Sequence, residues 1–270
     1  MQDSLLYNKK MKNLDLKSKY DKVWSNNAYK NFYSTPGDFE HTIEIANFIP
    51  DWKNLSVVDI GCGEGDLASI IKSAGAKSVL GIDFSEEAIR IAKCKYNIPG
   101  LDFESVDYKN LEQDKVFDVI VMKGTLEHFD KPFEELDYLI KNRLMDGGSV
   151  VTSSPSFLNL RGHIWMTLQL LFDVPMSLTD LHFLCPFDFE EFCRQNNYEL
   201  EYKPVAQDQG CGDSLITDFN KRLRNALKDR GMEGNVDKLL EWLEKAIQYK
   251  QYDLYTGAHQ IYKINKKNHE

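Results

Sequence analysis

Three glycines and two aspartates in the first half of the chain have the types and spacing of a nucleoside-binding site. Gly61, Gly63 and Gly65 form a G-x-G-x-G loop, Asp59 precedes it by two residues, and Asp83 follows later in the chain. Glycines let the backbone turn sharply and let a ligand approach without interference from a Cβ atom. A carboxylate placed like that of Asp83 can accept hydrogen bonds from both hydroxyls of a ribose.

A strand, a tight loop, a helix and a second strand are needed to position these residues. Leu55 to Ile60 contains the apolar run of the first strand, Leu67 to Lys72 has the spacing of a short helix, and Ser78 to Ile82 is a second apolar run that ends at Asp83. This order predicts a βαβ unit. Ser85 is expected to cap the helix that follows.

A second acidic residue follows the third predicted strand. Leu101 to Val106 is expected to form that strand, and Asp107 comes directly after it. At this position a carboxylate can accept a hydrogen bond from the amino group of adenine. Phe84 and Tyr108 are expected to flank the purine, because an aromatic face suits stacking.

Two classes of ligand use such a loop. A dinucleotide site requires G-x-G-x-x-G, and Asp66 occupies its sixth position here. D-x-G-x-G-x-G followed by I-D-x-S instead resembles motifs I and II of the class I S-adenosylmethionine (SAM) methyltransferases. An α/β domain without a nucleotide, whose glycines serve only the turn, is the remaining alternative.

The resemblance implies that SAM is the cofactor and S-adenosylhomocysteine (SAH) its product. It implies a loop that contacts the amino-acid part and the ribose, with Cys62 as a small filler. The cofactor-binding residues that we predict are Asp59, Gly61, Cys62, Gly63, Asp83, Phe84, Asp107, Tyr108 and Lys123.

The remaining strands complete an α/β fold. Val116 to Met122 is a near-continuous apolar run, typical of a strand buried on both faces, and Asp146 to Gly148 is a turn into a fifth strand, Ser149 to Ser153. Alternating β and α elements predict a doubly wound sheet. In the methyltransferase topology, Tyr198 to Val205 and Ala258 to Lys266 add an antiparallel hairpin, so that seven mostly parallel strands are expected.

Residues just after the fourth strand are candidates for catalysis. Ligands bind beside the switch point of such a sheet, so Lys123 to Phe129 should line the cleft. Methyl transfer is an in-line displacement in which a base removes the acceptor proton where there is one. His128 is the predicted base, since histidine titrates near neutrality, and Glu127 is expected to orient it or bind the acceptor. His182 is the third catalytic candidate.

The runs L-E-H and H-F-L-x-P-F resemble the subgroup of methyltransferases that includes ubiquinone- and sugar-tailoring O-methyltransferases. Some ubiquinone-pathway members hold a metal on E-x-x-E-H. Gly124 occupies the first of those positions here, so no metal site is predicted.

Acceptor contacts are expected from a helical cap. Arg161 can hold an acidic group through its planar guanidinium, and His163, Trp165 and Tyr29 are further candidates, although the same histidine and tryptophan suit a core position. Residues 1–37 are predicted to be a helical arm or lid, and 38–270 the methyltransferase domain. Within it, 155–197 is the predicted substrate cap and 213–250 a helical insertion, with a loop at Gln207 to Gly212 and helices at 213–228 and 236–249.

Composition limits the partners. The 270 residues are 42% hydrophobic and carry a formal net charge of −9, which argues against nucleic acid. Five scattered cysteines predict neither a disulfide framework nor a zinc site. No signal peptide or membrane span is evident, which predicts a soluble cytoplasmic protein, monomeric or homodimeric.

The sequence therefore predicts a SAM-dependent methyltransferase acting on an oxygen of a small polar metabolite, such as a sugar or a phosphate-bearing surface-glycan precursor. Methylation of nitrogen, or of a phenolic or quinone-like acceptor, is the alternative within the enzyme class. A SAM- or nucleotide-binding module without turnover, and a dinucleotide oxidoreductase, are the alternatives outside it.

Overall fold

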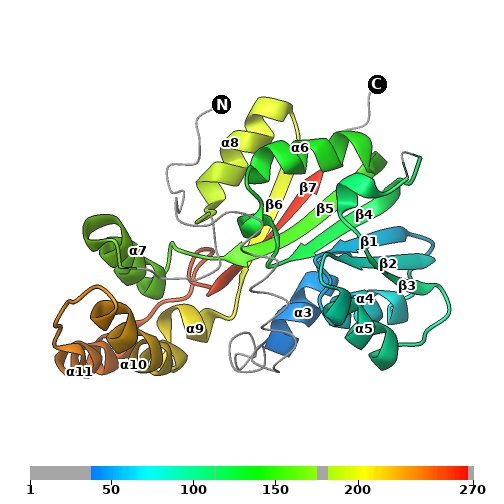
Figure 1. Cartoon of the computed structure of the whole chain (residues 1–270). Coiled ribbons are helices and arrows are strands. Elements are labelled where there is room, and N and C mark those ends of the chain that lie inside the picture. Colours follow the sequence, from blue (N-terminus) through cyan, green and yellow to red (C-terminus); the bar gives the residue numbers. More distant parts are fainter. Residues whose placement is uncertain (1–37, 113, 175–181, 267–270) are drawn as a thin grey trace.

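A seven-stranded sheet forms the centre of the computed structural model, which describes residues 38–112, 114–174 and 182–266 (Figure 1). The strand order is β3-β2-β1-β4-β5-β7-β6. Strands β1 to β5 are parallel, and β7 runs antiparallel to both of its neighbours. The strands are β1 Ser56–Ile60, β2 Ser78–Asp83, β3 Leu101–Ser105, β4 Phe117–Lys123, β5 Leu144–Pro155, β6 Glu199–Val205 and β7 His259–Asn265. The predicted doubly wound sheet with a terminal hairpin is confirmed.

Helices cover both faces of this sheet. α3 (Asp38–Ala46), α4 (Asp66–Ser73) and α5 (Glu86–Lys95) lie on one face, and α6 (Pro132–Asn142) and α8 (Pro186–Asn196) lie on the other (Figure 1). Each face has its own apolar core. The α5 helix begins where the sequence predicts, because the Ser85 hydroxyl accepts a hydrogen bond from the Ala88 amide at 3.3 Å.

The strand order reverses between β1 and β4, at the centre of the sheet. Asp59 lies opposite Gly81 on one side and Val121 on the other, so the strand ends that carry Gly61, Asp83 and Lys123 meet at one edge. Ligands of open α/β sheets bind at this edge.

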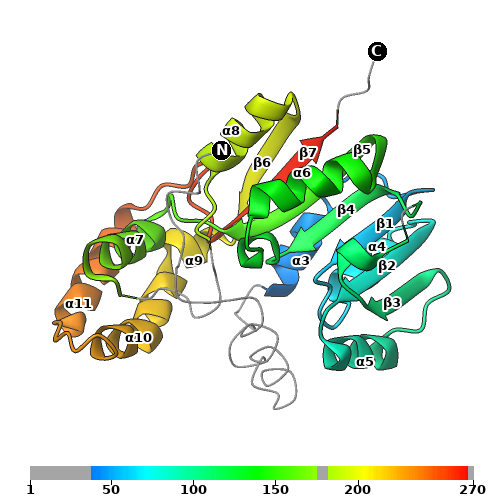
Figure 2. The same cartoon turned by 45° about the horizontal axis from the view of Figure 1, so that its top comes forward.

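Four further helices lie together beyond the end of the sheet (Figures 1 and 2). They are α7 (Leu160–Phe172), α9 (Gln207–Cys211), α10 (Asp213–Lys228) and α11 (Val236–Ala246). Phe157, Trp165, Phe219 and Leu243 belong to their common apolar core. The first part of the segment expected as the cap, from Phe157 to Cys185, therefore shares one core with the expected insertion, whereas α8 packs on the sheet.

Three predicted boundaries are wrong. The segment expected as a loop at Gln207 to Gly212 contains α9, because the Asp208 carboxylate accepts hydrogen bonds from the amides of Asp213 and Ser214 and continues the helical path. β5 begins at Leu144, which pairs with Phe117 before the register shifts. The last helix ends at Ala246 and continues as a 3₁₀ turn, Ile247–Tyr249.

The helices of the described part of the chain include none that is long and apolar enough to cross a membrane.

Candidate cofactor and acceptor site

The glycine loop is held in a left-handed conformation by its neighbours. The φ angles of Gly61, Gly63 and Gly65 are 73°, 54° and 83°. The amides of Gly61 and Cys62 both donate to the carbonyl of Ile82, at 2.8 and 3.0 Å, so the loop is tied to the end of β2. Burial and two nearby carboxylates raise the pKa of the Cys62 thiol, which therefore stays protonated.

Asp83 is oriented by the backbone. Its Oδ2 accepts from the Gly63 amide at 3.1 Å, and its Oδ1 accepts from the Ser85 amide at 2.8 Å. A carboxylate oxygen can accept more than one hydrogen bond, so these oxygens can also accept from hydroxyl donors. The adjacent Phe84 side chain is 42% exposed.

Asp107 and Tyr108 differ in their surroundings. Asp107 is exposed, and its Oδ1 accepts from the Lys109 amide at 2.9 Å. Tyr108 is buried, stacks on Phe129 and donates its hydroxyl hydrogen bond to Glu135. These contacts account for the Tyr108 ring without a ligand, so its role beside adenine stays a prediction.

The segment after β4 packs directly against the glycine loop. A Cβ atom on Gly61 would lie 2.5 Å from Oγ1 of Thr125. The backbone turns at Gly124, whose φ is 60°, and the Gly124 amide donates to the carbonyl of Ser153. Gly61 is therefore required both by its backbone angle and by this contact.

Asp59 is a buried carboxylate beneath the loop. It is 1% exposed, and within the described residues neither of its oxygens has a hydrogen-bond partner. Burial and the charge of Asp83 raise its pKa from 3.8 to about 7, while Lys123 acts in the opposite direction. An orphaned buried carboxylate at a ligand-binding edge is the kind of group that a cationic ligand satisfies.

Polar side chains continue from Asp59 across the same face of the sheet. Lys123 lies on β4, Ser153 is its partner on β5, and His259 begins β7. The ring of His259 stacks on His41 of α3, with centroids 4.4 Å apart. We call Asp59, Lys123, Ser153, His259 and His41 the polar row.

Most of the polar row has hydrogen-bonding capacity that the described residues do not use. Ser153 Oγ, His41 Nε2 and His259 Nδ1 are buried without a partner among them. Lys123 Nζ donates to Thr42 Oγ1 at 2.7 Å. Burial, then the charge of Lys123, lowers the pKa of His41 to about 3, and burial also lowers the pKa of His259. Both imidazoles are therefore neutral at pH 7.

Sequence analysis did not name the two histidines of the polar row among the candidate site residues. His41 is only 5% exposed. The two residues lie far apart in the chain and meet only because β7 returns antiparallel to β5. The only local signal was the place of His259 at the start of a predicted strand.

Of the predicted catalytic residues, Glu127 and His182 pack together after β4, and Glu127 contacts Ser154, which alternates with Ser153 along β5 and so faces the other side of the sheet. Glu127 is 2% exposed, and its Oε2 accepts from the Ser154 hydroxyl at 3.1 Å. The His182 amide donates to the Glu127 carbonyl, and His182 Nε2 donates to the carbonyl of Asp130. Burial lowers the pKa of His182. His128 lies half-buried in the 3₁₀ turn Leu126–His128.

The acceptor-binding residues predicted on α7 lie in different environments. Trp165 is 1% exposed, stacks on Phe219 and carries the Arg222 guanidinium over its ring, so it belongs to the core of the helical group, and its pocket role stays a prediction. His163 is exposed. Arg161 donates to the carbonyl of Ala258, next to the polar row. Tyr29 and the expected lid lie outside the described residues.

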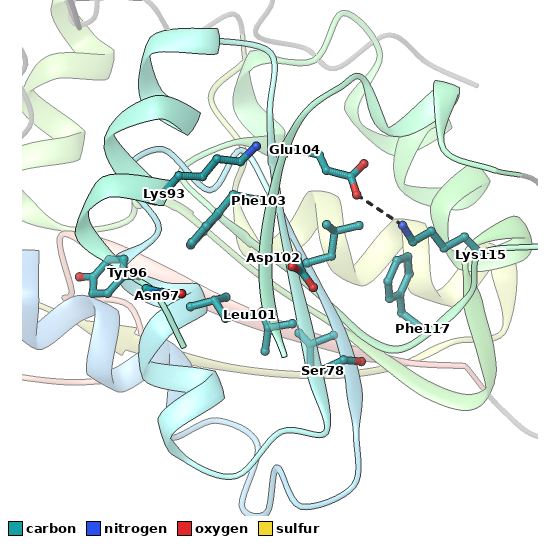
Figure 3. Close-up of a pocket in the computed structure, with 13 residues that line it drawn as sticks. Ser78, Lys93, Tyr96, Asn97, Leu101, Asp102, Phe103, Glu104, Lys115 and Phe117 are labelled. Atoms are coloured by element: carbon teal, nitrogen blue, oxygen red, sulfur yellow. Dashed lines mark ion pairs between the residues drawn. The ribbon is translucent and has the colours of Figure 1, made fainter. Parts of the chain in front are cut away.

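A hollow lies along the edge strand β3 and is lined by its residues Leu101 to Glu104 (Figure 3). Lys93 and Tyr96 line one side, and Lys115 lines the other, 3.8 Å from Glu104. Charged side chains at an unpaired edge discourage pairing with another strand. In the described ranges, no group of three or more His, Cys, Asp or Glu is placed to hold a metal ion.

The edge that carries the glycine loop fits SAM. Positive-φ glycines give close access to the backbone, Asp83 has acceptors for ribose hydroxyls, and Asp59 offers an unpaired carboxylate to a cationic ligand. SAM carries both a ribose and cationic groups, so the chemistry of the donor set matches it.

Comparison with known proteins agrees with this fit. A family model described as a methyltransferase domain matches residues 51–210. The chain belongs to this methyltransferase family. The 235L protein of Invertebrate iridescent virus 6, named as a methyltransferase, is 37% identical over 202 residues, which cover 73% of this chain and 71% of that protein. The mitochondrial ubiquinone biosynthesis O-methyltransferase of Dictyostelium discoideum is 29% identical over 190 residues, or 62% of this chain. Those residues span 58% of the length of the Dictyostelium enzyme.

Solved methyltransferases share the fold. A Haloferax volcanii protein named as a methyltransferase, solved with the Trm112 methyltransferase activator, superposes with a TM-score of 0.62 at 16% identity, covering 94% of this chain and 98% of that one. The plantazolicin methyltransferase BpumL in complex with SAH gives 0.53 at 21%, covering 94% and 96%. These matches show that the chain shares the Rossmann-like fold of solved methyltransferases. With the family match and the donor set at the glycine-loop edge, they identify the chain as a SAM-dependent methyltransferase.

Proposed function

We propose that this methyltransferase transfers the methyl group of SAM to a hydroxyl oxygen of a small polar metabolite, and that the polar row binds this acceptor. The observation that carries the proposal is the set of unpartnered atoms on Ser153, His41 and His259, beside the cofactor edge. Buried polar groups without partners cost free energy, so their concentration at a ligand-binding edge favours ligand recognition as their purpose.

Neutral groups suit a neutral acceptor. A serine hydroxyl and two uncharged imidazoles can both donate and accept hydrogen bonds, which matches the hydroxyls of a sugar. Lys123 and Arg161 lie close enough to His259 to influence its pKa and can contact a phosphate on the same molecule. A sugar or a phosphate-bearing glycan precursor therefore fits the row.

The cofactor edge has its own residues. In this proposal Asp83 accepts from the ribose hydroxyls, Asp107 and Phe84 contact adenine, and Asp59 faces a cationic group. When bound, SAM supplies a methyl group activated on a sulfonium. The chain contributes alignment, which alone provides several kcal/mol in such reactions.

The residues after β4 handle the acceptor proton in this proposal. His128 accepts the proton as the methyl is transferred, which contributes roughly 10²–10⁴ in rate. Glu127 is fixed by Ser154 and by its backbone bond to His182, so it holds the 3₁₀ turn that carries His128. His182 is a positioning residue through its bond to Asp130.

The helical group is proposed as the cap over the acceptor, with residues 1–37 as a lid. The enzyme is proposed to act in the cytoplasm, as a monomer or homodimer.

A phenolic or quinone-like acceptor is the second candidate. The name of the Dictyostelium relative, a ubiquinone biosynthesis O-methyltransferase, favours it. Such an acceptor has one reacting hydroxyl on an apolar ring and would leave most of the polar row unsatisfied.

Methyl-labelled SAM tests the proposal directly. The purified enzyme is incubated with it and with matched panels of sugars, sugar phosphates, nucleotide sugars, catechols and amines, and labelled products are identified by mass spectrometry. Label on a sugar oxygen supports the proposal, and label on a catechol supports the second candidate. Label only on amines would contradict both. Stabilisation by SAH but not by NAD, without any product, would favour a binding module.

A further inference from the structure

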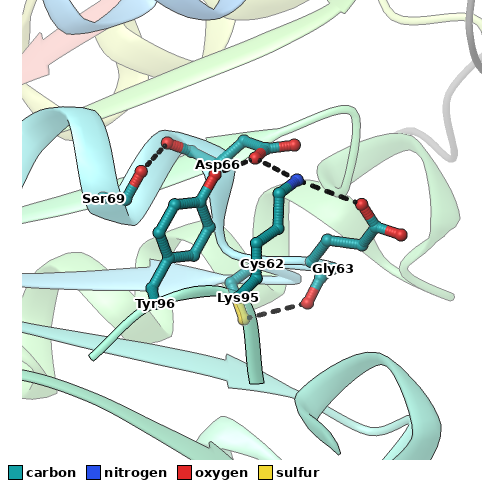
Figure 4. Close-up of polar contacts among 7 residues, drawn as sticks. Cys62, Gly63, Asp66, Ser69, Lys95 and Tyr96 are labelled. Carbon is teal, nitrogen blue, oxygen red and sulfur yellow. Dashed lines mark hydrogen bonds and ion pairs between the residues drawn. The ribbon is translucent and has the colours of Figure 1, made fainter. Parts of the chain in front are cut away.

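Asp66 joins the glycine loop to the end of α5. It is the first residue of α4 and follows Gly65 directly. Its Oδ1 accepts hydrogen bonds from the hydroxyl of Tyr96 and from Lys95 Nζ, the latter at 2.6 Å (Figure 4). Lys95 also reaches Oε2 of Glu64, within the loop, at 3.2 Å. Lys95, the last residue of α5, and Tyr96, the C-cap of that helix, therefore hold Glu64 in the loop and Asp66 at its end. We call these four residues the clamp.

This clamp acts on the outer half of the loop. The inner half is fixed by the bonds of Gly61 and Cys62 to the Ile82 carbonyl. On the outer half, Gly65 sits so close to the ring of Phe103 that a Cβ atom would lie 2.5 Å from it. The Glu64 side chain, which Lys95 contacts, is only 15% exposed.

The protonation states favour the clamp at neutral pH. Burial lowers the pKa of Lys95, but the hydrogen bonds to Asp66 and Glu64 and the charge of Asp66 outweigh burial and raise the pKa overall. Burial and the bond to Asp66 raise the pKa of Tyr96. Both groups therefore keep the protons that they donate.

We propose that Lys95 and Tyr96 are positioning residues for the cofactor, which hold Glu64 and Asp66 so that the glycine loop is already shaped for SAM. A loop ordered before binding does not lose its freedom on binding, so affinity improves without any new contact to the ligand. Neither side chain needs to touch SAM for this effect. The proposal depends on SAM binding and not on the identity of the acceptor.

Calorimetric titration of the full chain with SAH tests the clamp. Lys95→Met is expected to raise the Kd of SAH about three- to tenfold at low salt, and Tyr96→Phe about two- to fivefold. Because charges screen at high ionic strength, the Lys95→Met effect should shrink in 0.5 M NaCl. Lys95→Arg, which keeps the charge and two donors, should restore the Kd to within about twofold.

Lys93→Met is the matched control, since Lys93 lies on the same helix, is exposed and faces the hollow along β3. It should leave the Kd unchanged. A wild-type Kd for Lys95→Met would overturn the proposal. The proposal would also be overturned if Lys95→Met raised the Kd, Lys95→Arg did not restore it, and the unfolding midpoint of the ligand-free variant fell at the same time. This pattern would indicate a merely structural role for Lys95.

Discussion

The imidazole rings of His41 and His259 stack face to face, at an interplanar angle of 27°, although one lies on a helix and the other on the last strand. Each ring has a buried nitrogen without a partner in the described part of the chain. Because these buried nitrogens make no hydrogen bond to the described residues, the arrangement lowers the stability of the folded protein. Under the proposed function, the acceptor supplies the missing partners.

Replacing both histidines by phenylalanine separates stability from turnover. The double variant His41→Phe/His259→Phe keeps two stacked rings and removes the unpartnered nitrogens. We expect kcat/KM for the acceptor to fall about 10- to 100-fold, since lost hydrogen bonds to the acceptor are not replaced. The Kd of SAH should stay within twofold, and a rise of similar size in that Kd would contradict an acceptor role.

The same variant changes the pH dependence of stability. The pKa of His41 is about 3 in the folded protein and 6.5 is its ordinary value, so unfolding takes up a proton between these limits. The wild-type protein therefore loses stability as pH falls from about 6.5 towards 3, by about 2 kcal/mol at pH 5 from this ring. In urea unfolding, the difference in the free energy of unfolding between the double variant and the wild-type protein should favour the variant more at pH 5 than at pH 8. Equal differences at both pH values would contradict the assigned burial.

Asp59→Asn is expected to stabilise the empty protein and weaken cofactor binding. The pKa of Asp59 is raised to about 7, so the folded protein binds the extra proton and loses stability as pH rises from about 4 to 7. Removing the charge should raise the free energy of unfolding at pH 8 by about 2–4 kcal/mol and change it little at pH 4. Chemical denaturation at both pH values measures this difference.

The same substitution tests the cationic contact. With the carboxylate gone, the Kd of SAH should rise about 10-fold or more at pH 8. In the wild-type protein, affinity should increase as pH rises through about 7, and this dependence should vanish in the variant. If the Kd of SAH changed with pH in the same way in the wild-type protein and in Asp59→Asn, the cationic contact would be contradicted.

Gly61→Ala tests the contact between the loop and the segment after β4. The added methyl meets the Thr125 hydroxyl and also requires a left-handed alanine, so a loss of about 1–3 kcal/mol and of SAH binding is expected. Gly75→Ala is the matched control, because Gly75 has a φ of 108° but open space around it. A Thr125→Ala partner substitution should recover part of the Gly61→Ala loss and none of the Gly75→Ala loss. If Gly61→Ala and Gly75→Ala lost equal free energy of unfolding, the contact between Gly61 and Thr125 would have no role.

His128→Ala should lower turnover about 10²- to 10⁴-fold with the Kd of SAH unchanged, since a base acts on the acceptor and not on the cofactor. Glu127→Gln, which can still accept the hydrogen bond from Ser154, should lower turnover less than His128→Ala does. The exposed Lys141→Met on α6 should have no effect on turnover. Quenched-flow single turnovers with labelled SAM measure the chemical step. Wild-type turnover in His128→Ala would move the search for the base to the polar row.

Much of the fold was predictable because it depends on local patterns. The apolar runs of β1, β2 and β4 and the glycine loop between β1 and α4 appear in the sequence in the order that builds the sheet. Ser85 marked the start of α5. The start of β5 was not predictable, because Leu144 joins the sheet through a shifted register that depends on its partner Phe117.

The candidate site was predictable on its cofactor side only. Asp59, Gly61 and Asp83 come from one βαβ unit, so their spacing determines their geometry. The acceptor side combines residues from α3, β5 and β7, and no spacing relates His41 to His259. Trp165 was ambiguous for the opposite reason, since an aromatic residue on a helix suits a core and a pocket equally until Phe219 is placed beside it.

The buried carboxylate beneath the glycine loop links the lifetime of the protein to metabolism. Above neutral pH, a molecule without its cofactor holds the charge of Asp59 in its interior, and under the proposed function the bound cofactor neutralises this charge. Ligands that bind only the folded state protect it from unfolding and from proteases. The cellular abundance of this enzyme should therefore follow the supply of SAM and SAH, so that a shortage of methyl donor removes the catalyst together with its substrate.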